Sequence, residues 1–141
     1  KLLVKSLPYG PFLIKPNNYE LGEIFGVRLT TRSSVIPYAK KLQNMGARNV
    51  LVSMAGEGAV LVSDDGRVID APAPEGKLIN GVGAGDSMVA GFMAGYLARH
   101  DYNHAFCMGV ASGSASAFSE NLATKEEIEK VYKTIVLEEK V

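Results

Sequence analysis

The 141-residue sequence has one cysteine, no tryptophan and no excess of charge of either sign. The single thiol, Cys107, excludes a disulfide within the chain and is typical of a reducing compartment, so we expect a cytoplasmic protein. Fifteen basic residues balance fifteen acidic ones, which removes the electrostatic argument for nucleic acid or a membrane surface as the main partner. No apolar stretch is long enough to cross a bilayer. An anionic ligand would therefore be held by local groups and not by the field of the whole molecule.

Hydrophobic residues make up 47% of the chain, which is typical of a folded, soluble domain. A chain of this size buries roughly two-thirds of the surface that its unfolded form exposes, so one core is feasible. The sequence opens on Lys1-Leu2-Leu3-Val4, an apolar, helix-like segment without an initiating methionine. We therefore expect residues 1–141 to be one part of a larger domain, with the upstream part missing.

Strand and helix patterns alternate in the first part of the chain. They are, in order, a strand at 12–15, a helix from Asn17 or Asn18 to Phe25 and Gly26, a helix capped by Ser33 or Ser34 and stopped by Gly46, and a strand at 49–53. The segments 59–62 and 67–69 flank Asp64-Asp65-Gly66, a strong signal for an antiparallel hairpin.

From Asp86 onward the pattern is helical to the end of the chain. The first of these helices has an apolar face formed by Val89, Phe92, Met93, Tyr96 and Leu97. The last begins with a capping box from Thr124 to Glu127. Strands that alternate with helices indicate an α/β fold. We expect the C-terminal portion of a mixed, mainly parallel sheet flanked by helices.

The run Gly81-Val82-Gly83-Ala84-Gly85-Asp86-Ser87 leads directly into a helix. Glycines let the backbone approach a ligand closely, and at a helix start the free N–H groups of residues 83 to 86 favour an anion. Asp86 has a simpler interpretation as a helix cap, and the residues alone favour that one.

Two phosphate-binding motifs do not fit this run. A Walker A loop requires a lysine after its last glycine, and none follows Gly85. The dinucleotide fingerprint requires glycine where Asp86 stands.

Three segments together resemble the ribokinase-like, PfkB-type family of sugar kinases. Gly83-Ala84-Gly85-Asp86 resembles the second signature of the family, and Ser53-Met54-Ala55-Gly56-Glu57-Gly58-Ala59 resembles its nucleotide loop. Lys15-Pro16-Asn17-Asn18-Tyr19-Glu20 resembles its N-x-x-E element, carried by Asn17 and Glu20. The motifs occur in the family's order and cover nearly the whole chain.

The resemblance implies catalytic roles at the glycine run. Asp86 would be the base that deprotonates a sugar hydroxyl, and the N–H groups of Gly83, Ala84 and Gly85 would form an anion hole for the transferred phosphoryl group. It also implies ATP and Mg²⁺ as cofactors, with Asn17 and Glu20 near the metal. The structural alternative for these two residues is a capped helix with a surface glutamate.

The resemblance further implies a set of nucleotide-binding residues along the phosphates, the ribose and the adenine. These are Ser53, Met54, Ala55, Gly56, Glu57, Gly58, Gly85, Ser112 and Gly113. A strand-to-hairpin turn that needs glycine accounts equally for the loop at 53–58. Plain helix packing accounts equally for Ser112 and Gly113.

Within the family, the motifs are most similar to those of kinases that convert fructose 1-phosphate to fructose 1,6-bisphosphate. Kinases of tagatose 6-phosphate are an alternative, although they usually have glycine at the position of Ala55. A nucleotide-binding module without catalysis is an alternative of another class. The resemblance implies ATP and a phosphorylated ketohexose as partners. A sheet edge and an apolar helix face left uncovered by the missing upstream part predict a homo-oligomer. Residues 1–141 alone are expected to be inactive because the sugar pocket lies largely upstream.

Overall fold

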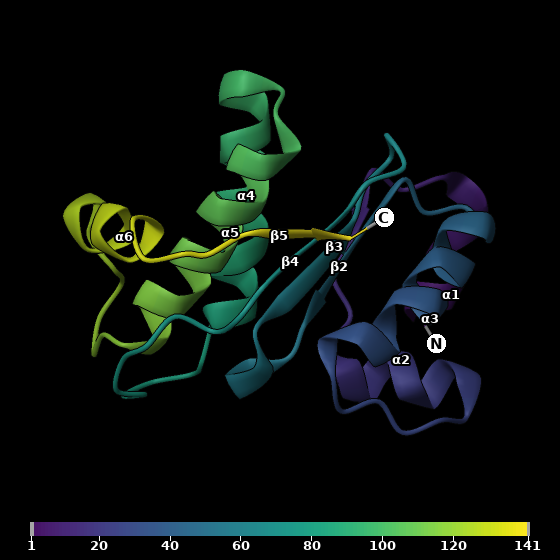
Figure 1. Cartoon of the computed structure of the whole chain (residues 1–141), viewed down its shortest axis with the longest axis horizontal. Coiled ribbons are helices and arrows are strands. Elements are labelled where there is room, and N and C mark those ends of the chain that lie inside the picture. The colour runs from purple at the N-terminus through teal and green to yellow at the C-terminus, as the bar shows by residue number, and fades with distance from the viewer. Residues whose placement is uncertain (1, 141) are drawn as a thin grey trace. The chain divides into compact units, whose positions relative to one another are not determined.

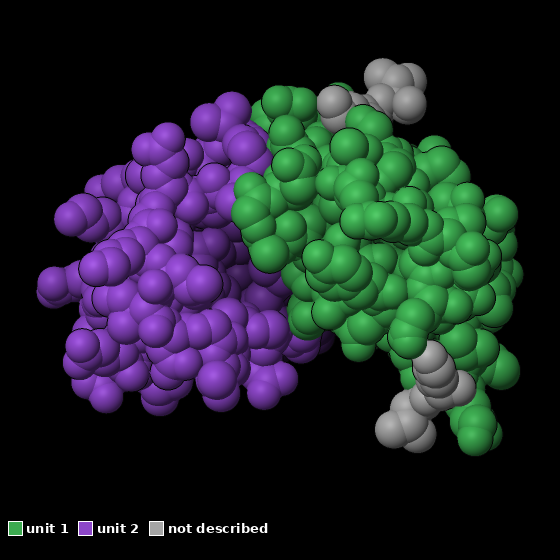
Figure 2. Space-filling model, turned by 90° about the horizontal axis from the view of Figure 1, so that it is seen from below, with its two compact units in different colours: residues 1–71, 137–141 green, residues 72–136 purple. Residues whose placement is uncertain are grey.

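The computed structural model describes residues 2–140. Its contacts divide the chain into two compact units (Figure 2). The first unit runs to Ala71 and takes up the chain again from Leu137, and the second spans Pro72–Val136. Each unit carries part of the sequence signals described above.

The first unit is built on a five-stranded mixed sheet in the order β1-β2-β3-β4-β5 (Figure 1). The strands are β1 at Leu13–Ile14, β2 at Asn49–Ser53, β3 at Ala59–Val62, β4 at Val68–Ala71 and β5 at Glu138–Lys140. Strand β1 pairs in parallel with β2, and the other three pairings are antiparallel.

The mixed sheet with flanking helices confirms the expected fold class, but parallel pairs do not predominate among the described strands. A parallel pair requires a long crossover, and the segment between β1 and β2, which contains α2 and α3, supplies one. The connection between β4 and β5 is also long, but those two strands pair antiparallel. The short connections after β2 and β3 allow antiparallel pairing alone. The turn between β3 and β4 matches the predicted hairpin, with Gly66 at φ 85°.

Helices cover one face of this sheet (Figure 1). They are α1 at Leu2–Ser6, a 3₁₀ turn η1 at Leu7–Tyr9, α2 at Asn18–Phe25 and α3 at Arg32–Asn44. Fully buried Val35, Ala39 and Leu42 of α3 pack in one apolar cluster with Val50 and Val60 of the sheet. Burial of this apolar surface is the main force that holds the layer together.

The ends of α2 agree with the prediction from sequence, whereas the start of α3 does not. Helix α2 begins after Asn17 and ends at Gly26, as predicted. The predicted cap of α3 at Ser33 or Ser34 is wrong, because Thr31 is the N-cap. Ser34 is instead the third helical residue, and its hydroxyl accepts the Thr31 N–H at 3.1 Å while Thr31 Oγ1 accepts the Ser34 N–H at 3.1 Å. Thr31 and Ser34 thus form one reciprocal capping box, in which each side chain accepts the backbone N–H of the other residue.

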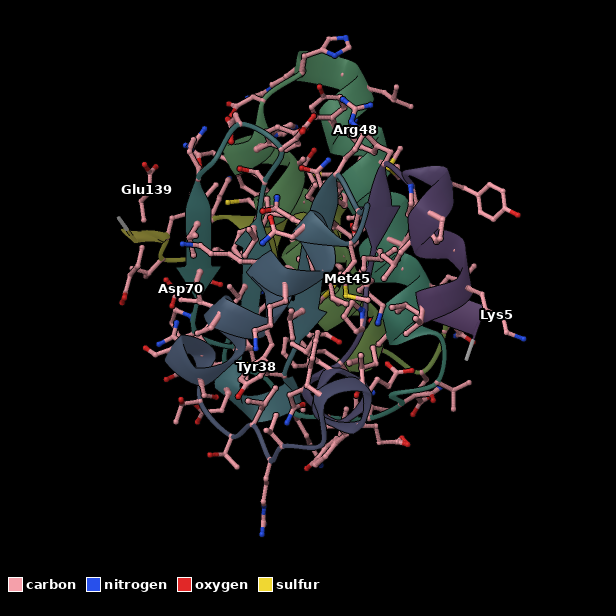
Figure 3. All side chains as sticks on the ribbon, turned by 90° about the vertical axis from the view of Figure 1, so that its right-hand side faces the viewer. Lys5, Tyr38, Met45, Arg48, Asp70 and Glu139 are labelled. Carbon is pink, nitrogen blue, oxygen red and sulfur yellow. The ribbon has the colours of Figure 1, made fainter. Side chains whose placement is uncertain are left out.

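The chain does not stay helical to its end, because β5 adds a strand to the edge of the sheet. Asp70 of β4 lies opposite Glu138 of β5 in the ladder between these two strands. Buried Asp70 is paired with Arg32 of α3 at 3.4 Å, and Arg67 is paired with Glu139 at 3.3 Å. Asp70 and Glu139 are labelled in Figure 3. A strand of three residues is too short to show the period of two that identifies strands, so the sequence does not predict β5.

The second unit contains α4 at Ala84–Arg99, α5 at Tyr102–Ala117 and α6 at Lys125–Tyr132. Helix α6 begins with the predicted capping box, in which Glu127 N–H donates to Thr124 Oγ1 at 3.2 Å. The predicted apolar face of α4 is partly wrong. Phe92 is fully buried, but Leu97 is 66% exposed, and Gly91 and Gly95 are the other buried residues. Close contact with α5 selects small residues here over large ones.

Candidate functional site

The glycine run forms a turn that ends at the start of α4. Gly83 is the N-cap residue with φ 83°, a left-handed conformation that glycine adopts without strain. The Val82 N–H donates to Asn80 Oδ1 at 3.0 Å, which closes the turn before it. The Ile79 and Asn80 N–H groups donate to the Ala117 carbonyl of α5 at 2.8 and 3.0 Å. The turn is therefore fixed to the C-terminal end of α5.

Three backbone N–H groups at this helix start are open. The first bond of the helix runs from the Ser87 N–H to the Gly83 carbonyl at 2.9 Å, and the Ala84 N–H donates to the Gly81 carbonyl at 3.3 Å. The N–H groups of Gly83, Gly85 and Asp86 have no acceptor among residues 2–140. Together with the positive end of the helix dipole they favour an anion. Of the three donors predicted for the anion hole, Ala84 is thus the one that the turn already uses.

Asp86 is the third residue of α4, and its side chain is exposed. Its carboxylate has no hydrogen-bond or ionic partner in the part of the chain that the structure describes. A helix cap would bond to a backbone N–H of its own turn, and Asp86 does not. The geometry therefore disfavours the cap interpretation and leaves the carboxylate available for chemistry.

The loop after β2 lies in the first unit and is held by its own backbone. A 3₁₀ turn, η2, spans Ala55–Glu57. The Met54 N–H donates to the Gly58 carbonyl at 2.9 Å, and the Glu57 N–H donates to the Met54 carbonyl at 3.0 Å. Met54 is buried, whereas Ala55, Gly56 and Glu57 are exposed. Ala55 has φ 46°, which is unusual for a residue with a Cβ atom.

The structure brings the start of the N-x-x-E element beside the start of this loop. Asn17 forms an isolated parallel bridge with Ser53, and the Ser53 N–H donates to the Pro16 carbonyl at 3.2 Å. Lys15 Nζ lies 3.4 Å from Ser53 Oγ. Reasoning from the sequence did not give Lys15 a role. Its place at the end of a strand, directly before the motif, was the available signal.

Asn17 and Glu20 form a reciprocal capping box at the start of α2. Its two bonds involve the Asn17 side-chain oxygen and one carboxylate oxygen of Glu20. The structural interpretation of these residues is therefore real. It does not exclude a metal role, because the second carboxylate oxygen of Glu20 takes no part in the box.

Ser112 and Gly113 are buried in α5 and face α4. A Cβ atom added to Gly113 would lie 3.1 Å from the Ala84 carbonyl oxygen, and the Ser112 hydroxyl would collide with a Cβ atom added to Gly91. Gly113 thus lies next to the start of α4, and Ser112 lies against Gly91 in the middle of that helix. Their predicted contact with adenine stays a prediction.

Histidine and cysteine side chains at the far end of α4 and α5 do not form a metal site. Within residues 2–140 no group of three or more His, Cys, Asp or Glu side chains is placed to hold a metal ion. His104 Nδ1 instead bonds with the Tyr132 hydroxyl at 2.9 Å, which joins α5 to α6. Burial lowers the pKa of His104, and Arg99 lowers it further. None of the helices in the described part of the chain could span a bilayer.

A mixed sheet with a glycine turn at a helix start is typical of α/β proteins that bind phosphate groups. The pfkB family of carbohydrate kinases matches residues 1–129. The chain therefore belongs to the pfkB family.

Individual relatives agree with this assignment. The 1-phosphofructokinase of Bacillus subtilis is 50% identical over 129 residues, which are 92% of this chain and 42% of that protein. The D-tagatose-1-phosphate kinase of Bacillus licheniformis is 33% identical over 130 residues, again 92% and 42%. A crystal structure from Staphylococcus aureus, assigned as a phosphofructokinase, has a TM-score of 0.93 at 40% identity and covers 99% of this chain and 45% of that one. These likenesses confirm the ribokinase-like fold. The chain spans less than half the length of each relative.

Proposed function

We propose that this chain is the nucleotide-binding and catalytic part of an ATP-dependent sugar-phosphate kinase. The observation that carries the proposal is the unpartnered carboxylate of Asp86 at a helix start with three open N–H groups. A base beside an anion site is what transfer of a phosphoryl group to a hydroxyl requires. Loss of the aspartate would be the first mark of a non-catalytic module, and Asp86 is present.

Asp86 accepts the proton of the acceptor hydroxyl in this mechanism. A positioned base contributes about 10²–10⁴ in rate. The open N–H groups of Gly83, Gly85 and Asp86 donate to the transferred group as its charge shifts, and fixed donors of this kind contribute a few kcal/mol each, on the order of 3. Ala84 supports this arrangement from within the turn through its bond to Gly81.

ATP supplies the phosphoryl group, and the residues present fit a nucleotide. Positions where a Cβ atom would meet no other atom within 4 Å occur at Gly56 and Gly83, so a ligand can approach the backbone at both. The ammonium of Lys15 beside Ser53 adds a positive charge that phosphate oxygens attract. In the first unit, Ser53 to Gly58 would line the phosphates and ribose.

Mg²⁺ fits the first unit through Glu20 and Asn17. One carboxylate and one amide oxygen are too few for a full cage, and Mg²⁺ usually keeps several waters and phosphate oxygens as ligands. Glu20 would hold a hydrated ion through its second oxygen while its first stays in the capping box.

Fructose 1-phosphate is the proposed acceptor, with fructose 1,6-bisphosphate as the product. The half-identical relative from Bacillus subtilis carries the name of this activity. A second candidate is D-tagatose 1-phosphate, which the name of the Bacillus licheniformis relative favours over the 6-phosphate expected from sequence. Both sugars present a free hydroxyl at C6 to the same base.

The test is a coupled ADP assay on the complete protein with ATP and Mg²⁺. Fructose 1-phosphate should give the highest kcat/KM among fructose 1-phosphate, D-tagatose 1-phosphate and fructose 6-phosphate. If none of these three sugar phosphates supports ATP turnover, the proposed sugar-phosphate kinase activity is wrong. Residues 1–141 alone should show no transfer, because the sugar pocket is expected to lie largely upstream and transfer requires the sugar to be ordered beside the base. A homo-oligomeric state of the complete protein also stays a prediction.

A further inference from the structure

Helices α4 and α5 touch through glycines, where backbones can approach most closely. A Cβ atom added to Gly95 would lie 3.0 Å from Met108 Cβ, and one added to Gly109 would lie 3.0 Å from the Met88 carbonyl oxygen. Such distances are shorter than ordinary van der Waals contact, so α4 would have to move by a few tenths of an ångström. The glycines thus set how far apart the two helices lie.

Gly113 differs from the others in the atom that it faces. An added Cβ would lie 3.1 Å from the carbonyl oxygen of Ala84, the first residue of α4. That carbonyl belongs to the same peptide group as the Gly85 N–H. A peptide group is planar and rigid, so a push on its oxygen reorients its N–H.

We propose that Gly113 is a positioning residue for phosphoryl transfer, because its missing side chain fixes the peptide plane that carries the open Gly85 N–H. The inference rests on the proposed function of the glycine turn. It gives α5 a role in the reaction beyond packing, although Gly113 itself need not touch a reacting atom. The turn is held to α5 at two points, through Ala117 and through Gly113.

Gly109 is a matched control on the same helix. An added Cβ there would be equally tight, at 3.0 Å from the Met88 oxygen and 3.2 Å from Phe92 Cβ. The peptide that it would push lies inside α4, where the N–H is already bonded within the helix. Gly109→Ala and Gly113→Ala therefore impose a similar strain on α4 and differ in whether an open N–H moves.

The experiment compares the two variants in the complete protein, with fructose 1-phosphate as acceptor. Both should lower the melting temperature to a similar extent. Gly113→Ala should lower kcat roughly 10-fold, since a displacement of 1 Å near a reacting group can reduce the rate about 10²-fold. Its KM for ATP should stay within about two-fold of the wild-type value, and Gly109→Ala should keep the wild-type kcat.

Amide hydrogen exchange at residues 83–87, measured without substrate, gives a second readout. Gly113→Ala should change the exchange rates there, and Gly109→Ala should not. An equal loss of kcat in both variants, an effect of Gly113→Ala on the KM for ATP alone, or unfolding of Gly113→Ala alone would overturn the positioning role. An inactive wild-type protein would instead reject the proposed function, while the exchange rates would still decide on Gly113.

Discussion

Asn17 and Glu20 each accept the other's backbone N–H. The Glu20 N–H donates to Asn17 Oδ1 at 2.8 Å, and the Asn17 N–H donates to Glu20 Oε1 at 2.8 Å. A cap of this kind stabilises a helix by about 1 kcal/mol. A mutation that breaks it would confuse loss of structure with loss of a metal ligand. The test of a magnesium role must therefore keep the box intact.

Glu20→Gln meets this condition, because glutamine serves as well as glutamate in a capping box. The free energy of unfolding should change by less than about 0.5 kcal/mol. The Mg²⁺ concentration for half-maximal turnover should rise several-fold, because one negative charge near the hydrated ion is lost. Glu23→Gln removes one negative charge from an exposed position of the same helix. It should leave the Mg²⁺ concentration for half-maximal turnover unchanged. If turnover depends on the Mg²⁺ concentration in the same way in both variants, Glu20 has a purely structural role.

Asp86→Asn tests the proposed base. The turnover number should fall by about 10²-fold or more while nucleotide affinity stays close to wild type. Because Asp86 makes no capping bond, stability should fall only by the helix-dipole contribution of about 0.3–1 kcal/mol. Glu126→Gln, in the first turn of α6, removes an equivalent charge and should not affect turnover. Turnover within a few-fold of wild type in Asp86→Asn would contradict the mechanism.

Ala55→Gly should stabilise the loop after β2. Ala55 adopts φ 46°, and a left-handed conformation disfavours a residue with a Cβ atom by about 1–2 kcal/mol. The greater freedom of glycine in the unfolded chain offsets about 0.4–1 kcal/mol of that gain. Denaturant unfolding should therefore show a net increase of roughly 0.5–1 kcal/mol.

Gly56→Ala is the reverse control in the same turn. Gly56 does not have a positive φ, and an added Cβ would meet nothing within 4 Å. The free energy of unfolding of the Gly56→Ala variant should therefore be unchanged or slightly higher. A loss of stability in Ala55→Gly would show that the loop requires the alanine methyl group.

Cys107 should resist alkylation in the folded protein. It is 7% exposed, and burial raises its pKa from 9.0 to about 11, with a further contribution from Asp101. Its thiolate fraction at neutral pH is thus about 100-fold below that of an ordinary thiol. Labelling of the Cys107 peptide, followed by mass spectrometry, should track unfolding. Rapid labelling under native conditions would contradict the burial.

The same shift predicts how stability depends on pH. The folded state holds the thiol proton more tightly than the unfolded state, so the contribution of Cys107 is fully present below pH 9. It should be lost as the pH rises from 9 toward 11. Cys107→Ala should reduce this alkaline loss in denaturant titrations, and an unchanged slope would assign the loss to other groups.

Signals carried by adjacent residues could be read from the sequence. The hairpin at Gly66, the ends of α2 and the box at Thr124 follow from turn and cap chemistry within a few positions. The glycine turn and its helix were predictable for the same reason. The prediction of the α3 N-cap was wrong because Thr31 and Ser34 are both suitable N-cap residues. Only the backbone conformation decides between them.

Features that depend on distant partners could not be read. Strand β5 exists because β4 offers an open edge, and the buried glycine face of α4 exists because α5 lies against it. Lys15 acquires a candidate role only once β1 and β2 pair and place it beside Ser53. Such relationships are set by tertiary contacts, which no local pattern records.

The two edge strands of the five-stranded sheet differ in how well they can pair with a further strand. Strand β5 closes one side with a short segment that carries Glu138 and Glu139, and short, charged edges discourage the addition of another strand. At the opposite side β1 presents Leu13 and Ile14, which carry no charge. Further strands contributed by the remainder of a longer protein would therefore extend the sheet from β1, immediately before Lys15 and the N-x-x-E element. An added strand would then lie beside the segment that leads into Asn17 and Glu20, the proposed metal residues.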